Sequence, residues 1–282
     1  MSIKIVVDSA SEFTYEEAKS LGLYFCPLSV TFGDKEYKDS IDINNQKFYE
    51  LLEAADELPK TSQVGPFTFQ EAFEEIVENG HTALAITLSS KLSGTYSSAR
   101  LAAQGFPDKV FLVDSLSATI GEKILVLYAL ELIKTIDDPE EIVKKLEAKR
   151  EKITICYLLD TLEYLHKGGR LSAAQALAGS ILSLKPLCGL SNGEVEVVAK
   201  ARGLKKGMEK LADAIRLAED YDPDMPAMMV YSGNDPKGLN KFKDLYPDIF
   251  GKDIESIPVS VMGSTIGTHV GPGTIGLAFF KK

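Results

Sequence analysis

The chain has 282 residues, of which 45% are hydrophobic and 26% charged. This composition fits a globular protein with one large domain or two of average size. The 31 Lys and Arg residues against 41 Asp and Glu residues give a net charge of −10, which argues against a general nucleic-acid binder. The uncharged stretch 171–184 is 14 residues long and contains Ser, Gln and Gly, so it is too short and too polar for a membrane span.

The three cysteines, Cys26, Cys156 and Cys188, lie far apart in apolar stretches. Such an odd, scattered set favours buried reduced thiols over disulfides or a zinc site. The first residues run directly into a strand pattern, so we expect no signal peptide. Together these features predict a soluble protein of the cytoplasm.

In the first half, short apolar runs alternate with helical patterns. Strands are predicted at 3–7, 24–32, 83–88 and 110–113. Helices are predicted near 69–78, at 97–104, at 120–135, and from Pro139 to about Glu151. This alternation is typical of a parallel sheet that helices cover on both faces.

The pattern then restarts in the second half. Strands are predicted at 153–159, 186–190, 194–201, 227–231, 256–261 and 277–280, and helices at 161–166, 173–184, 204–219 and 236–246. Ser191-Asn192-Gly193 lies between two of these strands and predicts a hairpin turn. The charged stretch 137–152 separates the halves, so we predict domains at 1–151 and 152–282. The expected class is α/β, with two α/β domains and mainly parallel sheets.

Several common active-site motifs are excluded. Residues 271–276 match G-x-G-x-x-G, but the chain ends six residues later and a strand pattern follows. A dinucleotide site needs a helix there, so this match is rejected. The sequence has no P-loop, no zinc-ligand spacing and no G-x-S-x-G elbow, and its three histidines exclude a His-rich metal site. We expect neither a metal nor a cofactor.

Hydroxyl-rich loops follow three of the predicted strands. They begin at Asp8-Ser9, at Ser89 and at Asp114-Ser115. Ligands of open α/β sheets bind at the carboxyl ends of strands, and the following helix supplies free N–H groups for an anion. Helix capping explains any one loop equally well, but three such loops favour a shared binding face. Ser93-Gly94 is the sharpest case, because it combines a short donor with an approachable backbone.

Two further segments carry polar groups of this kind. Thr61-Ser62-Gln63 lies between Pro59 and Pro66, which predicts an extended loop, although capping of the next helix is an alternative. His269 lies among four glycines, so backbone must come close to something there. A structural histidine and a catalytic Ser–His pair both remain open.

The basic clusters 167–170 and 200–203 are either solvated charge or a partner site.

Taken together, these motifs resemble the DegV family of bacterial fatty-acid-binding proteins. The matching segments run in the family's order over nearly the whole chain: Val7-Asp8-Ser9, Lys60-Thr61-Ser62-Gln63, Leu92-Ser93-Gly94-Thr95-Tyr96, Val113-Asp114-Ser115, Tyr164-Leu165-His166-Lys167-Gly168-Gly169-Arg170 and His269-Val270-Gly271-Pro272-Gly273. The resemblance implies two α/β domains with a long-chain fatty acid buried between them. It also implies that Thr61 and Ser93 bind the carboxylate, with His269 nearby.

The resemblance further implies that the protein is not itself an enzyme. It would present the carboxylate to a separate ATP-dependent fatty acid kinase, which forms an acyl phosphate for phospholipid synthesis. Arg170 and Arg202 would contact that kinase, and contact with a membrane surface would be at most transient. Two other functions stay open: an acyl-ester hydrolase that uses Ser93 with His269, and a carrier of another amphiphile without a kinase partner.

The sequence departs from the family pattern at Val64-Gly65 and at Glu122-Lys123. The first departure is expected to alter the loop that holds Thr61, and the second a helix start near Ser115. Acyl-chain preference therefore remains open. Residues 171–184 and 120–132 are apolar enough to form walls of a lipid tunnel, or simply to pack in the core.

Overall fold

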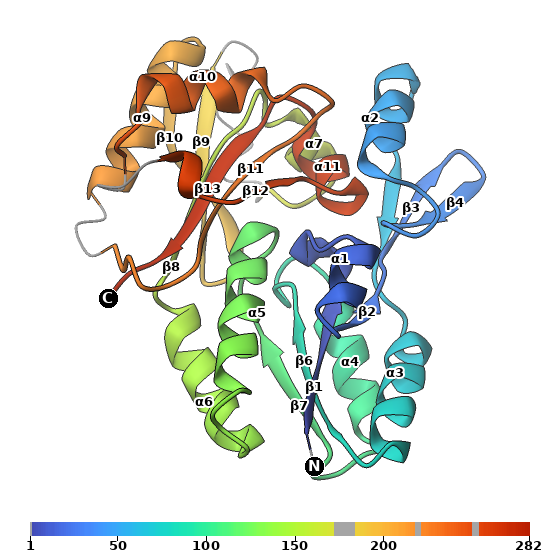
Figure 1. The fold of residues 1–282 in the computed structure, drawn as a ribbon. Helices are drawn as coiled ribbons and strands as arrows, with labels where there is room; N and C mark the ends of the chain where they lie inside the picture. Colours follow the sequence, from blue (N-terminus) through green and yellow to red (C-terminus); the bar gives the residue numbers. More distant parts are fainter. Residues whose placement is uncertain (1, 172–183, 218–220, 250–253) are drawn as a thin grey trace.

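The computed structural model describes residues 2–171, 184–217, 221–249 and 254–282. Each half of the chain builds its own main sheet, with the sheet of the N-terminal half in the lower part of Figure 1 and that of the C-terminal half in the upper part. The α/β class predicted from the sequence is confirmed. None of the helices in these ranges is long and apolar enough to cross a membrane.

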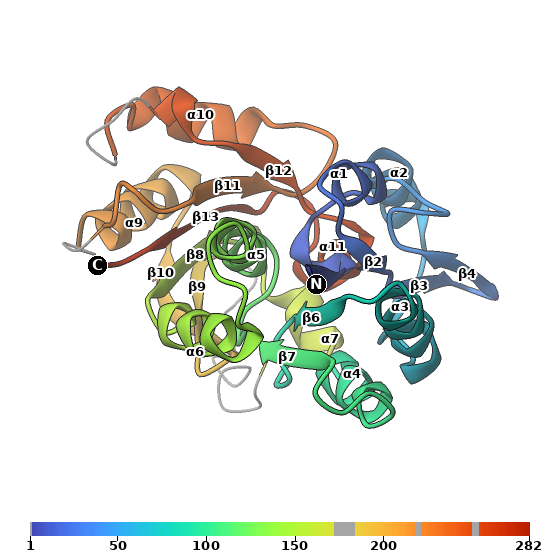
Figure 2. The same ribbon diagram turned by 60° about the horizontal axis from the view of Figure 1, so that its bottom comes forward.

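The first sheet has four parallel strands in the order β2-β1-β6-β7. Their bounds are β1 Ile3–Asp8, β2 Tyr24–Cys26, β6 Thr82–Thr87 and β7 Val110–Asp114. Every residue of β6 is buried, because helices cover both faces of the sheet. In Figure 2, α3 (Pro66–Glu78) and α4 (Thr95–Ala103) lie on one side, and α5 (Ile120–Leu132) and α6 (Pro139–Arg150) on the other.

The predicted strand at 24–32 is two strands that belong to different sheets. Tyr24–Cys26 joins the parallel sheet, whereas β3 (Ser29–Phe32) pairs with β4 (Lys35–Lys38) and β5 (Lys60–Ser62) in a small antiparallel sheet. Pro27 lies at the break, where a residue without an N–H group cannot continue the ladder. Thr61 therefore lies on a short strand and not in the loop expected for it.

The second sheet has six strands in the order β10-β9-β8-β13-β11-β12. Their bounds are β8 Ile153–Leu158, β9 Lys185–Ser191, β10 Glu194–Ala201, β11 Ala227–Tyr231, β12 Val259–Val261 and β13 Ile275–Phe280. Only β11 and β12 pair in parallel. The mainly parallel arrangement expected from the sequence thus holds for the first sheet and not for this one. β9 and β10 are joined by a two-residue turn, which can connect only antiparallel strands. The last strand, β13, lies inside the sheet and runs antiparallel to both of its neighbours, β8 and β11.

The predicted hairpin at Asn192-Gly193 is confirmed. β9 and β10 are antiparallel on either side of it, and both turn residues have positive φ, 49° for Asn192 and 82° for Gly193. A turn of this hand matches the twist of the two strands. The Ser89 hydroxyl donates to the Gly193 carbonyl at 2.8 Å, so the hairpin tip contacts the first half of the chain.

The remaining helices of the described ranges have between five and 14 residues. They are α1 Tyr15–Ser20, α2 Asn45–Ala54, α7 Glu163–Lys167, α9 Leu204–Leu217, α10 Lys237–Leu245 and α11 Ser264–Val270, with 3-10 turns at Ser9–Ser11 and Ile254–Ser256. The sequence pattern predicted neither α1, α2 nor α11. The predicted helix at 173–184 lies outside the described residues, apart from its last residue.

One hydrophobic core extends across both halves. It joins residues of the first sheet, such as Val6 and Ile86, to Tyr157 and Phe280 of the second, and α5 packs against strands of both sheets. The expected boundary between residues 151 and 152 falls in the connection from α6 to β8 and stays a prediction. All three cysteines are free and buried, as expected, and burial raises the pKa of the Cys188 thiol to about 12.

Candidate functional site

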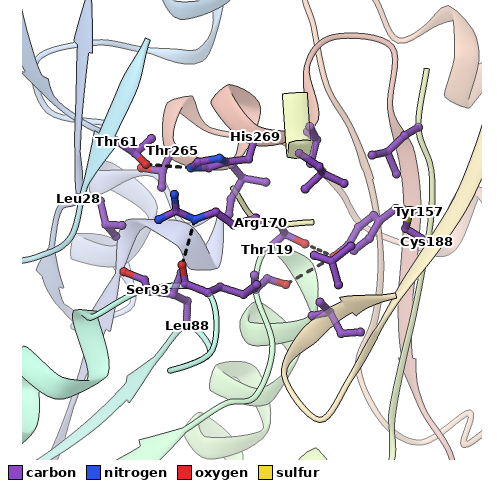
Figure 3. A pocket seen from close by; sticks show the side chains of 18 of the residues that line it. Leu28, Thr61, Leu88, Ser93, Thr119, Tyr157, Arg170, Cys188, Thr265 and His269 are labelled. Carbon is purple, nitrogen blue, oxygen red and sulfur yellow. Dashed lines mark hydrogen bonds between the residues drawn. The ribbon is translucent and has the colours of Figure 1, made fainter. Parts of the chain in front are cut away.

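A cavity lies between the two halves of the chain (Figure 3). It encloses about 760 Å³, counting the space at its mouth. Five polar lining residues lie toward one side in Figure 3: Thr61, Ser93, Arg170, Thr265 and His269. Most of the remaining wall is apolar, with Leu28, Leu88, Leu92, Leu159, Leu165, Cys188, Leu190 and Val195 among its residues. The cavity is therefore amphipathic, with a polar side and a long apolar surface.

Thr61 and His269 meet at the polar side of this cavity. Thr61 lies on β5 and His269 on α11, and a hydrogen bond of 2.8 Å joins Thr61 Oγ1 to His269 Nε2 across 208 positions of sequence. Their expected proximity is thus present in the structure.

Ser93 lies in the loop between β6 and α4, which follows the carboxyl end of an inner strand of the first sheet. Its hydroxyl is 3.0 Å from Thr95 Oγ1 and accepts a hydrogen bond from the Thr95 backbone N–H at 3.2 Å. The same Thr95 hydroxyl accepts from the Val64 backbone N–H at 3.3 Å. Ser93 and the segment that follows Thr61 are therefore fixed to each other, and both line the cavity.

Arg170 lies between Ser93 and His269 in Figure 3. Its guanidinium donates from Nε to the Leu92 carbonyl at 3.2 Å and from Nη1 to the Gly168 carbonyl at 2.7 Å. Arg170 therefore lines the polar side of the cavity and is not only a residue of the outer surface. Arg202, by contrast, is exposed just beyond β10 and does not line the cavity.

Two buried carboxylates hold the start of α11. Asp39 accepts hydrogen bonds from the backbone N–H groups of Ser264 and Thr265, each at 3.1 Å, and from the Thr265 hydroxyl at 2.7 Å. Glu12 accepts from the Gly263 N–H at 2.6 Å. These acids fix the helix whose far end carries His269. Sequence reasoning missed them because no local pattern relates residues more than 200 positions apart.

The glycines around His269 admit aromatic rings and do not form a flexible loop. A Cβ atom at Gly267 would lie 2.5 Å from the Phe48 ring, and one at Gly271 would lie 2.3 Å from the Tyr164 ring. The rejected G-x-G-x-x-G match is followed by strand β13, as expected. Close packing therefore explains Gly267 and Gly271.

His269 is neutral at pH 7. Burial, together with the smaller effect of the nearby positive charge of Arg170, lowers the pKa of its imidazole to about 4. The ring's Nδ1 has no hydrogen-bond partner within the described ranges. A hydrolase relay requires the imidazole to contact the serine and an orienting group at its other nitrogen. Here the imidazole contacts Thr61, so the arrangement does not match that relay.

The two departures from the family pattern lie outside the cavity wall. Gly65 precedes the first turn of α3, with Pro66 at its first position. Lys123 is buried and donates to Glu17 Oε2 at 2.7 Å, to the Glu12 carbonyl at 3.0 Å and to the Ser260 hydroxyl at 3.2 Å.

Burial raises the pKa of the neighbouring Glu122 carboxyl well above its usual range. Of the two roles left open for residues 120–132, core packing is the one observed, because the described cavity reaches Ala118 and Thr119 but no residue of α5. Of the other expected wall, 171–184, only its first and last residues are described.

Comparison with known proteins agrees with the fold. The profile described as "Uncharacterised protein, DegV family" matches residues 2–282. The chain belongs to the DegV family. A DegV domain-containing protein of Deinococcus radiodurans is 32% identical over 280 residues, which cover 99% of this chain and 98% of that protein.

Solved DegV structures are similar along the whole chain. A Thermus thermophilus structure described as "Fatty Acid Binding of a DegV family Protein" is 33% identical, covers 100% of both chains and has a TM-score of 0.90. A stearic acid-binding protein of Eubacterium ventriosum is 25% identical, covers 100% of this chain and 99% of its own, and has a TM-score of 0.86. Structural relatives of this chain thus bind fatty acids. No cluster of potential metal ligands occurs in the ranges described here.

The depressed pKa of His269 predicts a loss of stability in acid. The unfolded imidazole, with a pKa near 6.5, binds a proton before the folded one, whose pKa is about 4. Relative to His269→Gln, the wild type should therefore lose about 3 kcal/mol of unfolding free energy between pH 6.5 and 4, with no such difference developing above pH 6.5. Urea unfolding of both proteins at several pH values measures this.

His81→Gln provides the control, since the His81 ring lies in an exposed contact with Ser2. That variant should follow the wild-type pH profile. A constant difference between wild type and His269→Gln over the whole pH range would show that His269 does not titrate as a buried imidazole.

Proposed function

We propose that this protein binds a long-chain fatty acid in the cavity and presents its carboxylate to a separate ATP-dependent fatty acid kinase. The observation that carries the proposal is the amphipathic cavity itself, whose apolar wall leads to Thr61, Ser93, Arg170 and His269. Solved relatives bind fatty acids, which supports the same ligand class here.

The apolar wall suits an acyl chain. Each buried methylene contributes about 0.8 kcal/mol, so a long chain binds tightly without polar contacts along its length. The wall draws on both halves of the chain, with Leu28 and Leu88 from the first and Leu159, Leu165 and Leu190 from the second. Binding of the tail thus adds contacts between the halves.

The polar side suits a carboxylate. A charged group that leaves water needs several donors, and Thr61 and Ser93 supply hydroxyls there. If His269 donates from Nε2 to Thr61, the Thr61 hydroxyl hydrogen is free to bind the ligand. Because His269 has no formal charge at pH 7, the nearby cation is Arg170. Its guanidinium offsets the negative charge of the head group.

Presentation to a kinase requires an accessible head group and a docking surface. The acidic chain has a net charge of −10, so an exposed basic residue is a local feature that a partner can recognise. Arg202 is exposed and is the residue we assign to this contact. Arg170 reaches into the cavity, so we assign it contacts with both the head group and the kinase.

An ester hydrolase is disfavoured by the hydrogen bond that His269 makes with Thr61 in place of Ser93. The alternative of a carrier without a kinase partner assigns no contact to Arg202. The Arg202→Ala experiment below distinguishes it from the proposed function.

Replacing Ser93 by Ala should weaken binding of the acid and spare the corresponding alcohol. A hydrogen bond to a charged group contributes roughly 1.5–3 kcal/mol, which corresponds to a loss of affinity of roughly 10- to 150-fold. Thr61→Val should act likewise, and the two effects should not add, because both hydroxyls serve one carboxylate. Titration of each protein with a long-chain acid and with the alcohol of equal length measures both effects.

Ser97→Ala is the matched control, since Ser97 is exposed on α4 and should bind both ligands like the wild type. Equal losses for acid and alcohol in Ser93→Ala would show that Ser93 does not contact the carboxylate. A wild-type protein that binds neither ligand would refute the proposed function itself.

Arg202→Ala should reduce phosphate transfer from ATP to the bound fatty acid while leaving the binding constant for the acid unchanged. The reason is that Arg202 lies outside the cavity and acts only on the partner. Arg216→Ala removes another exposed arginine and should change neither quantity. The assay combines the loaded protein, an ATP-dependent fatty acid kinase and labelled ATP; unchanged transfer in Arg202→Ala would contradict the assigned contact.

A further inference from the structure

A second recess adjoins the cavity at Leu190, which lines both spaces. Three segments contribute to both spaces. In the segment before α5, Ala118 and Thr119 line the cavity, whereas Leu116 and Ser117 line the recess. In β8, Tyr157 lines the cavity, whereas Ile153 and Ile155 line the recess. Leu190 of β9 lines both spaces. The recess therefore continues along the same segments, beyond Thr119 and Tyr157.

Thr119 and Tyr157 line the cavity but not the recess, and we call this pair the partition. Their hydroxyl groups are joined by a hydrogen bond, and the Tyr157 hydroxyl also approaches the Ala118 carbonyl at 3.5 Å. Figure 3 shows this pair and Cys188 on the opposite side of the cavity from Thr61 and Ser93. An acyl chain bound by its carboxylate at Thr61 and Ser93 would thus direct its methyl end toward the partition.

The backbone is built around this pair. Thr119 has φ 56° and ψ −138°, a conformation that glycine adopts readily and a β-branched residue rarely does. Its N–H donates to the Ala10 carbonyl at 2.8 Å, which holds it there. On the other side, a Cβ atom at Gly276 would lie 2.2 Å from the Tyr157 ring, so the neighbouring strand leaves room for that ring.

The recess beyond the partition offers a different environment. Arg150 and Glu151 line it, and so does Ser117, whose buried hydroxyl has no partner within the described ranges. A methyl group that passed the partition would displace water from polar groups without replacing their hydrogen bonds. The favourable apolar surface therefore ends at Thr119 and Tyr157.

We propose that Thr119 and Tyr157 determine the maximum length of the acyl chain that the cavity accepts. This inference rests on the proposed function, because it assumes a fatty acid with its carboxylate at Thr61 and Ser93. The Tyr157 ring acts as the stop, and the Thr119 hydroxyl holds that ring across the cavity. The two residues are thus specificity-determining and make no contact with the reacting carboxylate.

A length series of saturated fatty acids tests the proposal. For the wild type, affinity should rise about fourfold per added methylene and then stop rising at a limiting length. Thr119→Gly suits the local backbone and removes the hydroxyl, so the rise should continue for about two further carbons, which is at least a tenfold gain for those acids. Tyr157→Leu shortens the stop itself and should move the limit in the same direction.

Tyr157→Phe is the matched control, since it keeps the ring and loses only the hydroxyl; its limit should move less than that of Tyr157→Leu. Leu165→Ala alters the cavity wall elsewhere and should lower affinity at every length without moving the limit. An unchanged limit in folded Thr119→Gly and Tyr157→Leu would overturn the inference while wild-type binding still supports the proposed function. If the wild type binds no acid of the series, the proposed function fails instead.

Discussion

The hydrogen bond between Thr61 and His269 joins residues 208 positions apart, and the polar side of the cavity depends on it. An imidazole that is buried among apolar groups and neutral at pH 7 needs a partner, and a hydroxyl on a neighbouring strand supplies one. The contact also holds the Thr61 side chain in place. A carboxylate that enters the cavity therefore meets side chains that are already positioned, which reduces the ordering required on binding.

Buried acids at the other end of α11 maintain this contact. Asp39 and Glu12 accept hydrogen bonds from the first residues of the helix, so helix and histidine are positioned from the N-terminal half of the chain. Burial raises the pKa of Glu12 well above its ordinary value, and that of Asp8 to about 7. Glu12 and Asp39 thereby join the two halves around the cavity, whereas Asp8 bonds within the first half, to Ala10 and Leu88.

Much of the first sheet and several site residues were predictable from the sequence. The strands that end at Asp8 and Asp114 have local apolar runs, and the loop containing Ser93 follows such a run directly. The Asn192-Gly193 turn also depends only on local backbone preference. Resemblance to a family then selected Thr61 and His269 from many polar residues, and the structure places both at one cavity.

Features that depend on long-range contacts were not predictable. The antiparallel pairing of β13 with β8 and β11 leaves no trace in the local pattern of any of these strands. The same holds for Asp39, whose partners lie 225 and 226 positions away, and for Arg170, which reads as surface charge in sequence but reaches the cavity. The Thr119–Tyr157 pair belongs to this class, since only the fold brings the two residues together.

Native mass spectrometry of the purified protein tests the central claim most directly, because it identifies what occupies the cavity. The fatty-acid-binding account predicts a species heavier than the 30.8 kDa chain by the mass of one long-chain fatty acid. Dissociation of that species should release the acid itself. A protein that retains only a ligand without a carboxyl group, or that stays unliganded after incubation with long-chain fatty acids, would contradict it.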